Sequence, residues 1–339
     1  MQEMTLPANV LDQIVCVCCD ISIWTGQKKL TPEDLDLSPE QIPPEGLAAL
    51  GHKRICDPKA IADFKRIKQQ AFTLLSNNGV RFLTGYAIPL EKLEEIQGKL
   101  AELEDEFYKV RNQFLSNYEE TIEAWIEAHP SWSHQIRRAV EPVERVAAAL
   151  SWRSSCFKVV HPGVTDKGLE DEANSLGRQL LREIAQEAKH IYTDSFHQKA
   201  SVTRKALRPL RRIYDKLMSL SFLEPRVQPY LKLMDTVLRD MKNITPIEGA
   251  NLNELKGMVL TLTKPERVLT CGDPGWTPEK PELLPEQPGL EPDEQGEATP
   301  AATSVQDIDA PDNDDGNLPD DKDMGREIPD FSQPPAWFY

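Results

Sequence analysis

The sequence lacks the short motifs that mark the active sites of most enzyme families. The segment Thr25-Gly26-Gln27-Lys28-Lys29 has a glycine and two lysines, but not the paired glycines with which backbone amides wrap a phosphate. The chain also contains no His-Glu-x-x-His pair, no Gly-x-Ser-x-Gly turn and no kinase signature. These absences argue against an enzyme and predict no catalytic residue and no bound cofactor.

Long hydrophobic runs are missing as well. No stretch reaches the roughly 18 apolar residues that a membrane span needs. The N-terminal Met-Gln-Glu has no basic flank, and the apolar run Ile14–Cys19 stops at Asp20, so no secretory signal is recognisable. We therefore expect a cytoplasmic protein that does not enter a membrane and whose six cysteines are reduced.

Two of these cysteines have a spacing that is typical of metal ligands. Cys16 and Cys19 form a Cys-x-x-Cys pair, and His52 with Cys56 would complete a four-ligand zinc site. The residues between the two cysteines are apolar and include no turn-forming glycine. Because free cysteines are among the most buried residue types, we interpret the pair as core residues, with a metal or redox role as the alternative.

The negative charge is concentrated at one end of the chain. The net charge is −16, and residues 273–339 hold 18 acidic against three basic residues, a net of −15. The same segment holds 12 of the 27 prolines and has neither helical nor strand periodicity. Such a composition buries too little apolar surface to offset the entropy of ordering, so we expect a disordered acidic tail over 273–339.

A heptad-like apolar repeat is the strongest pattern in the sequence. It predicts one helix from Glu91 to His129, roughly 60 Å long at about 1.5 Å per residue. After position 114 the repeat shifts by one residue, to Tyr118, Ile122 and Trp125. We expect the first seven apolar positions to pack against another helix, in the same chain or in an oligomer: Leu93, Ile96, Leu100, Leu103, Phe107, Val110 and Phe114.

Two segments are predicted as strands that pair with each other. Val80–Ile88 alternates and is rich in β-forming residues, and Cys156–Val160 is a shorter candidate. Residues 7–23 fit either a buried strand or a short helix. Helices are expected over 57–78, 133–152 with a kink at Pro142, 166–195, 202–222, 227–242 and 252–262.

Together these elements predict a mainly α fold: an elongated antiparallel helical bundle with two long helices and a small two-stranded β element. We divide the chain into an N-terminal segment, 1–89, a long-helix bundle, 90–265, and the tail, 273–339.

A strip of basic residues lies in the helix predicted for 202–222. At 100° per residue, the basic and apolar side chains fall on opposite halves of this helix. The strip is a candidate contact face for a nucleic-acid backbone, because closely spaced cations displace counterions. An ordinary solvated face and a docking site for the acidic tail are the alternatives. The residues are Arg204, Lys205, Arg208, Arg211, Arg212 and Lys216.

The chain ends in Trp337-Phe338-Tyr339, after an acidic and proline-rich segment. Three large aromatic residues with nothing local to bury them are typical of a short motif that docks in a partner's groove. We expect these residues to bind a protein partner, with chance composition as the alternative.

Several blocks of residues resemble a known family. They are Ile23-Trp24-Thr25-Gly26 with Lys28-Lys29-Leu30 and Asp34, Lys53-Arg54-Ile55 with Asp57-Pro58, Gly79-Val80-Arg81-Phe82-Leu83 with Gly85-Tyr86-Ala87 and Pro89, and Trp125 with His129-Pro130. In combination they are similar to domain of unknown function 3150, a family of bacteria, phages and mobile genetic elements. The resemblance implies a companion of MoxR-type AAA+ ATPases and von Willebrand A-type proteins, without a settled activity.

We therefore expect a non-enzymatic scaffold or adaptor, acting through protein–protein interaction and coiled-coil packing. The alternative is a nucleic-acid-binding protein of a mobile element that uses the basic strip. A third class, an elongated pore-former, would need an apolar segment that enters lipid, and Cys156–Val160 is too short for this.

Overall fold

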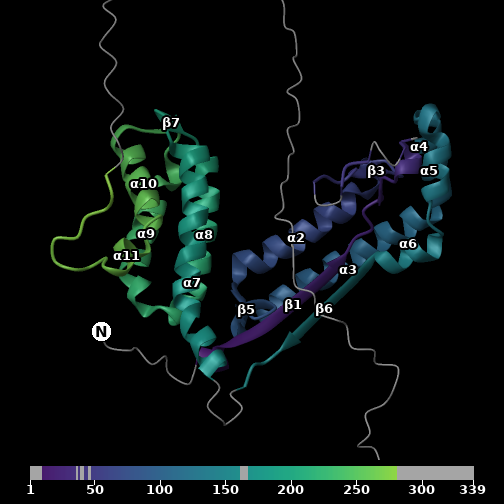
Figure 1. Ribbon diagram of the computed structural model, residues 1–339. Helices are drawn as coiled ribbons and strands as arrows, with labels where there is room; N and C mark the ends of the chain where they lie inside the picture. Colours follow the sequence, from purple (N-terminus) through teal and green to yellow (C-terminus); the bar gives the residue numbers. More distant parts are fainter. Residues whose placement is uncertain (1–9, 36, 39–41, 45–46, 161–166, 281–339) are drawn as a thin grey trace, which may run out of the picture. The chain divides into compact units, whose positions relative to one another are not determined.

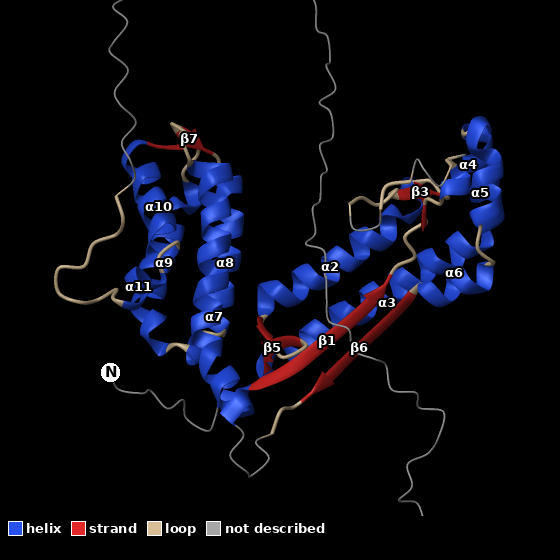
Figure 2. Ribbon diagram, in the orientation of Figure 1, coloured by secondary structure: helices blue, strands red, loops and turns tan. Residues whose placement is uncertain are grey.

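A four-stranded antiparallel sheet, in the order β4-β5-β1-β6, organises the fold (Figures 1 and 2). The structure is a computed structural model that describes residues 10–35, 37–38, 42–44, 47–160 and 167–280. These residues belong to one compact unit, Met1–Leu284. The sheet strands are β1 (Ile14–Ser22), β4 (Val80–Phe82), β5 (Gly85–Pro89) and β6 (Ser151–Phe157).

Two further strand pairs are small. They are β2 (Gln27–Lys29) with β3 (His52–Arg54), and β7 (Ser201–Val202) with β8 (Ile247–Glu248). The helices of the described residues are α1 (Val10–Gln13), α2 (Ala62–Asn78), α3 (Leu93–Ser116), α4 (Tyr118–Ala128), α5 (Ser133–Ala139), α6 (Val143–Ala149), α7 (Lys167–Ile191), α8 (Leu207–Ser219), α9 (Gln228–Asp240), α10 (Gly249–Leu262) and α11 (Pro265–Leu269).

Strand β1 is one of the two interior strands of the sheet, and it contributes side chains to both hydrophobic cores. Its apolar residues are buried on both faces, which explains why the sequence shows a continuous apolar run here rather than an alternation. Because successive side chains of a strand point to opposite faces, Cys16 belongs to one core and Val17 to the other.

The first core lies between one face of the sheet and helices α7 to α11. Helix α10 packs against α7, and α8 packs against α9. Its fully buried members include Leu180, Leu210, Tyr230 and Leu255. The Tyr230 hydroxyl donates a 2.5 Å hydrogen bond to the Met258 carbonyl, so this large buried side chain has its polar atom satisfied.

The second core lies on the other face of the sheet, beneath helices α2 to α6. Aromatic residues dominate it, and Phe64 of α2 makes edge-to-face contacts with Phe107 and Phe114 of α3 at ring-centre distances of 5.3 and 5.8 Å. The heptad positions of α3 therefore pack within the chain, against α2, and Leu100, Phe107 and Phe114 are buried there.

The expected elongated two-long-helix bundle is wrong, because the molecule has an α+β fold. The predicted helix from Glu91 to His129 ends at Ser116 and begins again at Tyr118, so α3 spans only about 36 Å. The break at Asn117 coincides with the one-residue shift in the apolar repeat. It lets Tyr118 turn into the second core, where its hydroxyl donates to the Glu141 carbonyl at 2.9 Å.

The expected two-stranded element is wrong for a related reason. The segment predicted as one strand, 80–88, is a hairpin that turns at Leu83, which has a left-handed backbone with φ of 52°. The second predicted strand lies further toward the N-terminus than expected, as β6, and its partner is β1. The two segments that were expected to pair with each other are instead parts of a four-stranded sheet, in which β1 lies between β5 and β6.

The remaining predicted helices are present with shifted ends. The helix expected over 133–152 is divided into α5 and α6 at Pro142, and β6 follows it. The expected boundary at 89/90 falls between β5 and α3, and the sheet draws strands from both sides of it. No helix among the described residues is both long and apolar enough to span a bilayer.

Candidate functional site

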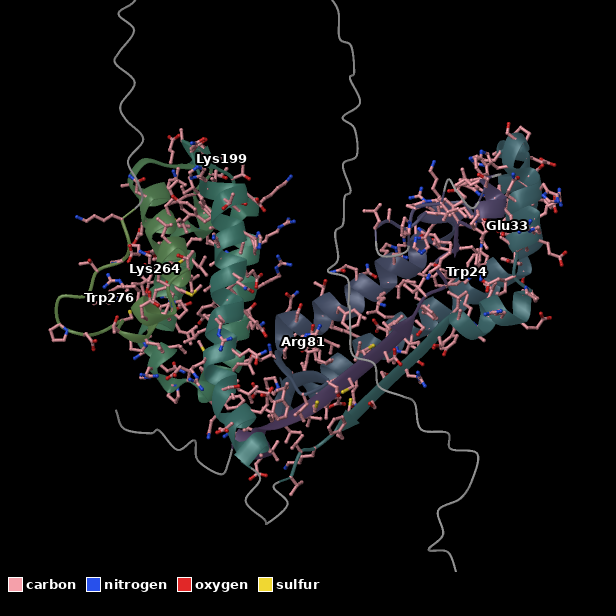
Figure 3. The ribbon with its side chains drawn as sticks, in the orientation of Figure 1. Trp24, Glu33, Arg81, Lys199, Lys264 and Trp276 are labelled. Atoms are coloured by element: carbon pink, nitrogen blue, oxygen red, sulfur yellow. The ribbon has the colours of Figure 1, made fainter. Side chains whose placement is uncertain are left out.

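Helix α8 separates apolar from basic side chains as the sequence predicts. Leu207, Leu210, Ile213 and Leu217 recur at steps of three and four and lie in the first core. Arg204, Lys205, Arg208, Arg211 and Arg212 are exposed. Figure 3 shows nitrogen-tipped side chains that extend from α8 on the side away from α9 and α10.

Lys216 differs from the other five predicted basic residues, because its side chain is only 5% exposed. It lies between the buried positions Ile213 and Leu217, at the edge of the apolar stripe. Its ammonium donates to the Glu183 carboxylate of α7 at 2.9 Å, which compensates the buried charge. Lys216 therefore anchors α8 to α7 and does not contribute to the exposed face.

The exposed cations line a hollow at the start of α8. It has a volume of about 650 Å³, and Lys242, Asn243 and Thr245, which follow α9 in the chain, also line it. A second hollow of about 430 Å³ adjoins it, shares Thr203 and Lys205, and includes Lys199. We call the first hollow the basic groove and define its cations as Arg204, Lys205, Arg208, Arg211 and Lys242.

Within the described part of the chain, these five cations form no ion pair. Other exposed arginines do, for example Arg239 with Asp235 and Arg137 with Glu123. Like charges that share a groove without counter-charges create a positive potential, which an anion relieves on binding. The groove is therefore an electrostatic site for an anion with several negative charges.

Toward the C-terminal end of α8, beyond the residues that line the groove, a polar cluster joins α8 to α7 and to the sheet. Glu183 accepts from Lys216, and also from the backbone N–H of Arg81 in β4 at 3.3 Å. Burial raises the pKa of the nearby Glu187 carboxyl, although Lys216 and Arg212 lower it. This cluster holds the basic face of α8 in place.

The conspicuous sequence blocks around Trp24 meet at a second place, near β2 and β3. The Trp24 indole N–H donates to the Glu141 carboxylate at 2.7 Å, and Lys28 pairs with the same carboxylate at 2.5 Å. The Trp24 ring also packs against Phe114 and Tyr118. Figure 3 shows Trp24 among the side chains of the α2 to α6 group. These residues are accounted for by packing.

Two glycines of the block from Gly79 to Pro89 are required because backbone atoms of other residues lie close to them. A Cβ atom at Gly85 would lie 2.4 Å from the Val17 carbonyl oxygen, and one at Gly79 would lie 2.7 Å from the Ala87 oxygen. Because a real side chain cannot come so near a backbone oxygen, both glycines let the hairpin lie against its neighbours.

The cysteine cluster considered in the sequence is not brought together. Cys16 and Cys19 point to opposite faces of β1, and among the described residues no group of three or more His, Cys, Asp or Glu side chains could hold a metal ion. Burial, together with Glu104 and Asp20, raises the pKa of the Cys19 thiol to about 12. Its sulfur is therefore a protonated thiol at neutral pH.

Most of the acidic segment lies outside the described residues, and so do Trp337, Phe338 and Tyr339. Its first part, 273–280, is described and packs on α10 and α11. The Trp276 indole N–H donates to the Arg267 carbonyl at 2.8 Å, and Glu279 pairs with Lys264 at 3.1 Å. Figure 3 shows Trp276 and Lys264 beside helices α10 and α11.

The molecule is an α+β protein with an exposed groove lined by five cations. The chain matches the family model described as protein of unknown function (DUF3150) over residues 11–264, and it therefore belongs to this family. The match ends near the last residues of α10 and includes the whole basic groove. Comparisons with curated proteins and with solved structures gave no match.

The sequence missed part of the groove. Lys242, Asn243 and Thr245 follow α9, between 23 and 26 residues beyond the end of α8 at Ser219, and only the folded structure brings them to the groove. Lys242 alone was visible as an isolated basic residue at a helix end, which is a common and uninformative position.

Proposed function

We propose that this protein is a non-enzymatic nucleic-acid-binding protein whose basic groove takes the phosphate backbone. The observation that supports it is the set of five exposed cations, four within residues 204–211 and one at Lys242, that share one groove and make no ion pair in the described part of the chain. Binding would release the counterions condensed on the nucleic acid, which is the main source of affinity for such surfaces.

The experiment is fluorescence anisotropy of a labelled 24-nucleotide DNA, single-stranded or annealed, titrated with the full chain at low salt. The Arg208→Ala/Arg211→Ala variant is expected to weaken binding at least tenfold, because it removes two phosphate contacts. Arg137→Ala/Arg138→Ala on α5 removes the same charge from exposed arginines elsewhere and should leave affinity within about twofold. Equal losses in both variants, or no binding at low salt, would refute the proposal.

A second candidate is the adaptor expected from the family resemblance, a companion of a MoxR-type AAA+ ATPase and a von Willebrand A-type protein in a mobile element or phage. The observation that favours it is β6, an edge strand paired on one side with β1 and exposed at five consecutive residues, 153–157. Such an edge offers backbone groups to a partner strand.

The adaptor proposal is tested by recovery of a MoxR-type ATPase on the immobilised full chain. The variant Trp337→Ala/Phe338→Ala/Tyr339→Ala is expected to recover less ATPase, because these aromatic residues would supply the docking motif. Undiminished recovery removes the role of the three aromatic residues. No recovery by the unmodified chain removes the adaptor proposal.

A further inference from the structure

The basic groove contains cations and hydroxyl groups but no stacking platform. Within the described residues, none of the side chains that line it or the adjoining hollow is aromatic. Hydroxyl groups come from Thr203, Thr245 and Ser201, and Asn243 adds a carboxamide. Asp194 is the carboxylate among the residues of the adjoining hollow, whose lining does not include Arg208 or Arg211.

This composition separates two kinds of nucleic acid. Proteins that bind single strands combine a positive groove with aromatic side chains on which the bases stack, at about 1–3 kcal/mol per base. A duplex keeps its bases stacked on one another and presents phosphates outward. A protein that binds its backbone therefore needs only cations and polar donors. The groove supplies the cations and polar donors that a duplex backbone needs, but not the aromatic side chains on which single-stranded bases stack.

The spacing of the cations also fits a rigid row of phosphates. Arg208 and Arg211 are three residues apart on α8, and Arg204 lies in the 3₁₀ turn that leads into this helix. The three residues span about 10 Å at about 1.5 Å per residue. Phosphates of one strand of a duplex advance about 3.4 Å each along the axis and also wind around it, so about two of them lie within this span. Lys242 faces the same hollow from the segment that follows α9.

We infer that the basic groove takes the phosphate backbone of a nucleic-acid duplex, irrespective of base sequence and in preference to a single strand. The inference rests on the proposed function and specifies its substrate. The cations that would contact the duplex come from residues 204–211 and from Lys242. Because the contacts go to phosphates, they carry no sequence information.

The test compares four labelled probes with the full chain at the same salt concentration: two 24-base-pair DNA duplexes of unrelated sequence, a 24-base-pair RNA duplex and single-stranded dT of 24 nucleotides. The DNA duplexes should bind within about twofold of each other and at least fivefold more tightly than dT. Binding should weaken with salt with a logarithmic slope of about −4, because each of four to five contacts contributes about −0.9. In Arg208→Ala/Arg211→Ala the slope should fall by about 2.

The outcomes separate the inference from the proposed function. Binding of dT as tightly as of the duplexes overturns the preference for a duplex and leaves nucleic-acid binding intact. A strong preference for one DNA sequence overturns the backbone-only contact. Absence of binding to every probe at low salt overturns both. The RNA arm supports the inference when it exceeds dT, and its ratio to DNA identifies which duplex the groove prefers.

Discussion

Glu183 and Lys216 form an ion pair of 2.9 Å that joins α7 to α8, and the lysine side chain is only 5% exposed. Lys216 follows the exposed Arg212 by four residues, so the pair lies one helical turn along α8 from an exposed arginine. A charge buried to this extent is tolerated only with a partner, so the position of the basic face depends on a carboxylate from another helix.

Replacing Glu183 with Gln should lower the free energy of unfolding by about 2–4 kcal/mol, somewhat less than for a fully buried pair because the Glu183 side chain is 26% exposed. The reason is that the Lys216 ammonium would remain buried without a counter-charge. Urea denaturation followed by circular dichroism measures the change. Asp235→Asn, which breaks the exposed pair with Arg239, is the control and should cost no more than about 0.5 kcal/mol. Equal effects would contradict the prediction.

Replacing Gly85 with Ala should destabilise the protein by about 1–3 kcal/mol, the usual cost of overpacking. The new methyl group would lie 2.4 Å from the Val17 oxygen in the neighbouring strand, which cannot move without disturbing the sheet. Gly98→Ala in α3 is the matched control. It meets open space in a helix and should stabilise by about 0.5–1 kcal/mol. Thermal unfolding of both variants measures these changes in stability. If Gly85→Ala does not change the stability, the two strands are further apart than the 2.4 Å approach implies.

Replacing Leu83 with Asn should stabilise the protein by about 0.5–1 kcal/mol, because Asn tolerates a left-handed backbone better than Leu does. Leu83 has a φ of 52° and is 51% exposed, so little apolar burial is lost. Leu90→Asn removes a leucine that is 49% exposed and should change stability by less than about 0.5 kcal/mol. If the Leu83 variant is no more stable than the Leu90 variant in urea, the hairpin is not strained.

Stability should decline as the pH rises from about 9 to about 12, because several buried acids have raised pKa values. Burial raises the pKa of Cys56 to about 11 and that of Tyr118 to about 12, from ordinary values of 9.0 and 10.0. Their neutral forms are favoured in the folded state, so the contribution is complete below the ordinary pKa. It is lost as the pH passes through the raised value, since the unfolded chain ionises first.

The measurement is the free energy of unfolding in urea, with a reductant, at several pH values between 8 and 11. Tyr118→Phe should make the decline shallower because one ionising group is removed. It should also cost about 1 kcal/mol at pH 8, since the Glu141 carbonyl loses its 2.9 Å hydrogen bond from the hydroxyl. A stability that does not change across this range would contradict the assignment of these groups to the core.

Helices were the part of the fold that the sequence predicted well, since their periodicity is local. Helix α7 and the basic face of α8 follow directly from spacings of three and four residues. The end of α3 was also signalled, by the shift of the apolar repeat before Tyr118, but a heptad pattern alone does not distinguish a shift from a break.

The sheet could not be predicted in the same way. Strand β1 is apolar on both faces and therefore shows no alternation, and it pairs with Tyr86 to Pro89 and with residues 151–157, which are far away in the chain. The two residues of the hairpin loop, Leu83 and Thr84, include neither glycine nor asparagine, so the usual hairpin signal is missing. In the groove, the burial of Lys216 depends on Glu183 of α7, a contact between helices that periodicity does not contain.

Successive side chains of β1 point to opposite faces of the sheet, and this affects how the molecule unfolds. Cys16 and Val17 are adjacent in the chain, yet each completes a different set of packed helices. Detaching this strand would uncover both sets of apolar side chains at once, so neither set forms an independent folding unit. The helices that carry the arginines and those that enclose Trp24 should therefore melt together, in one cooperative transition.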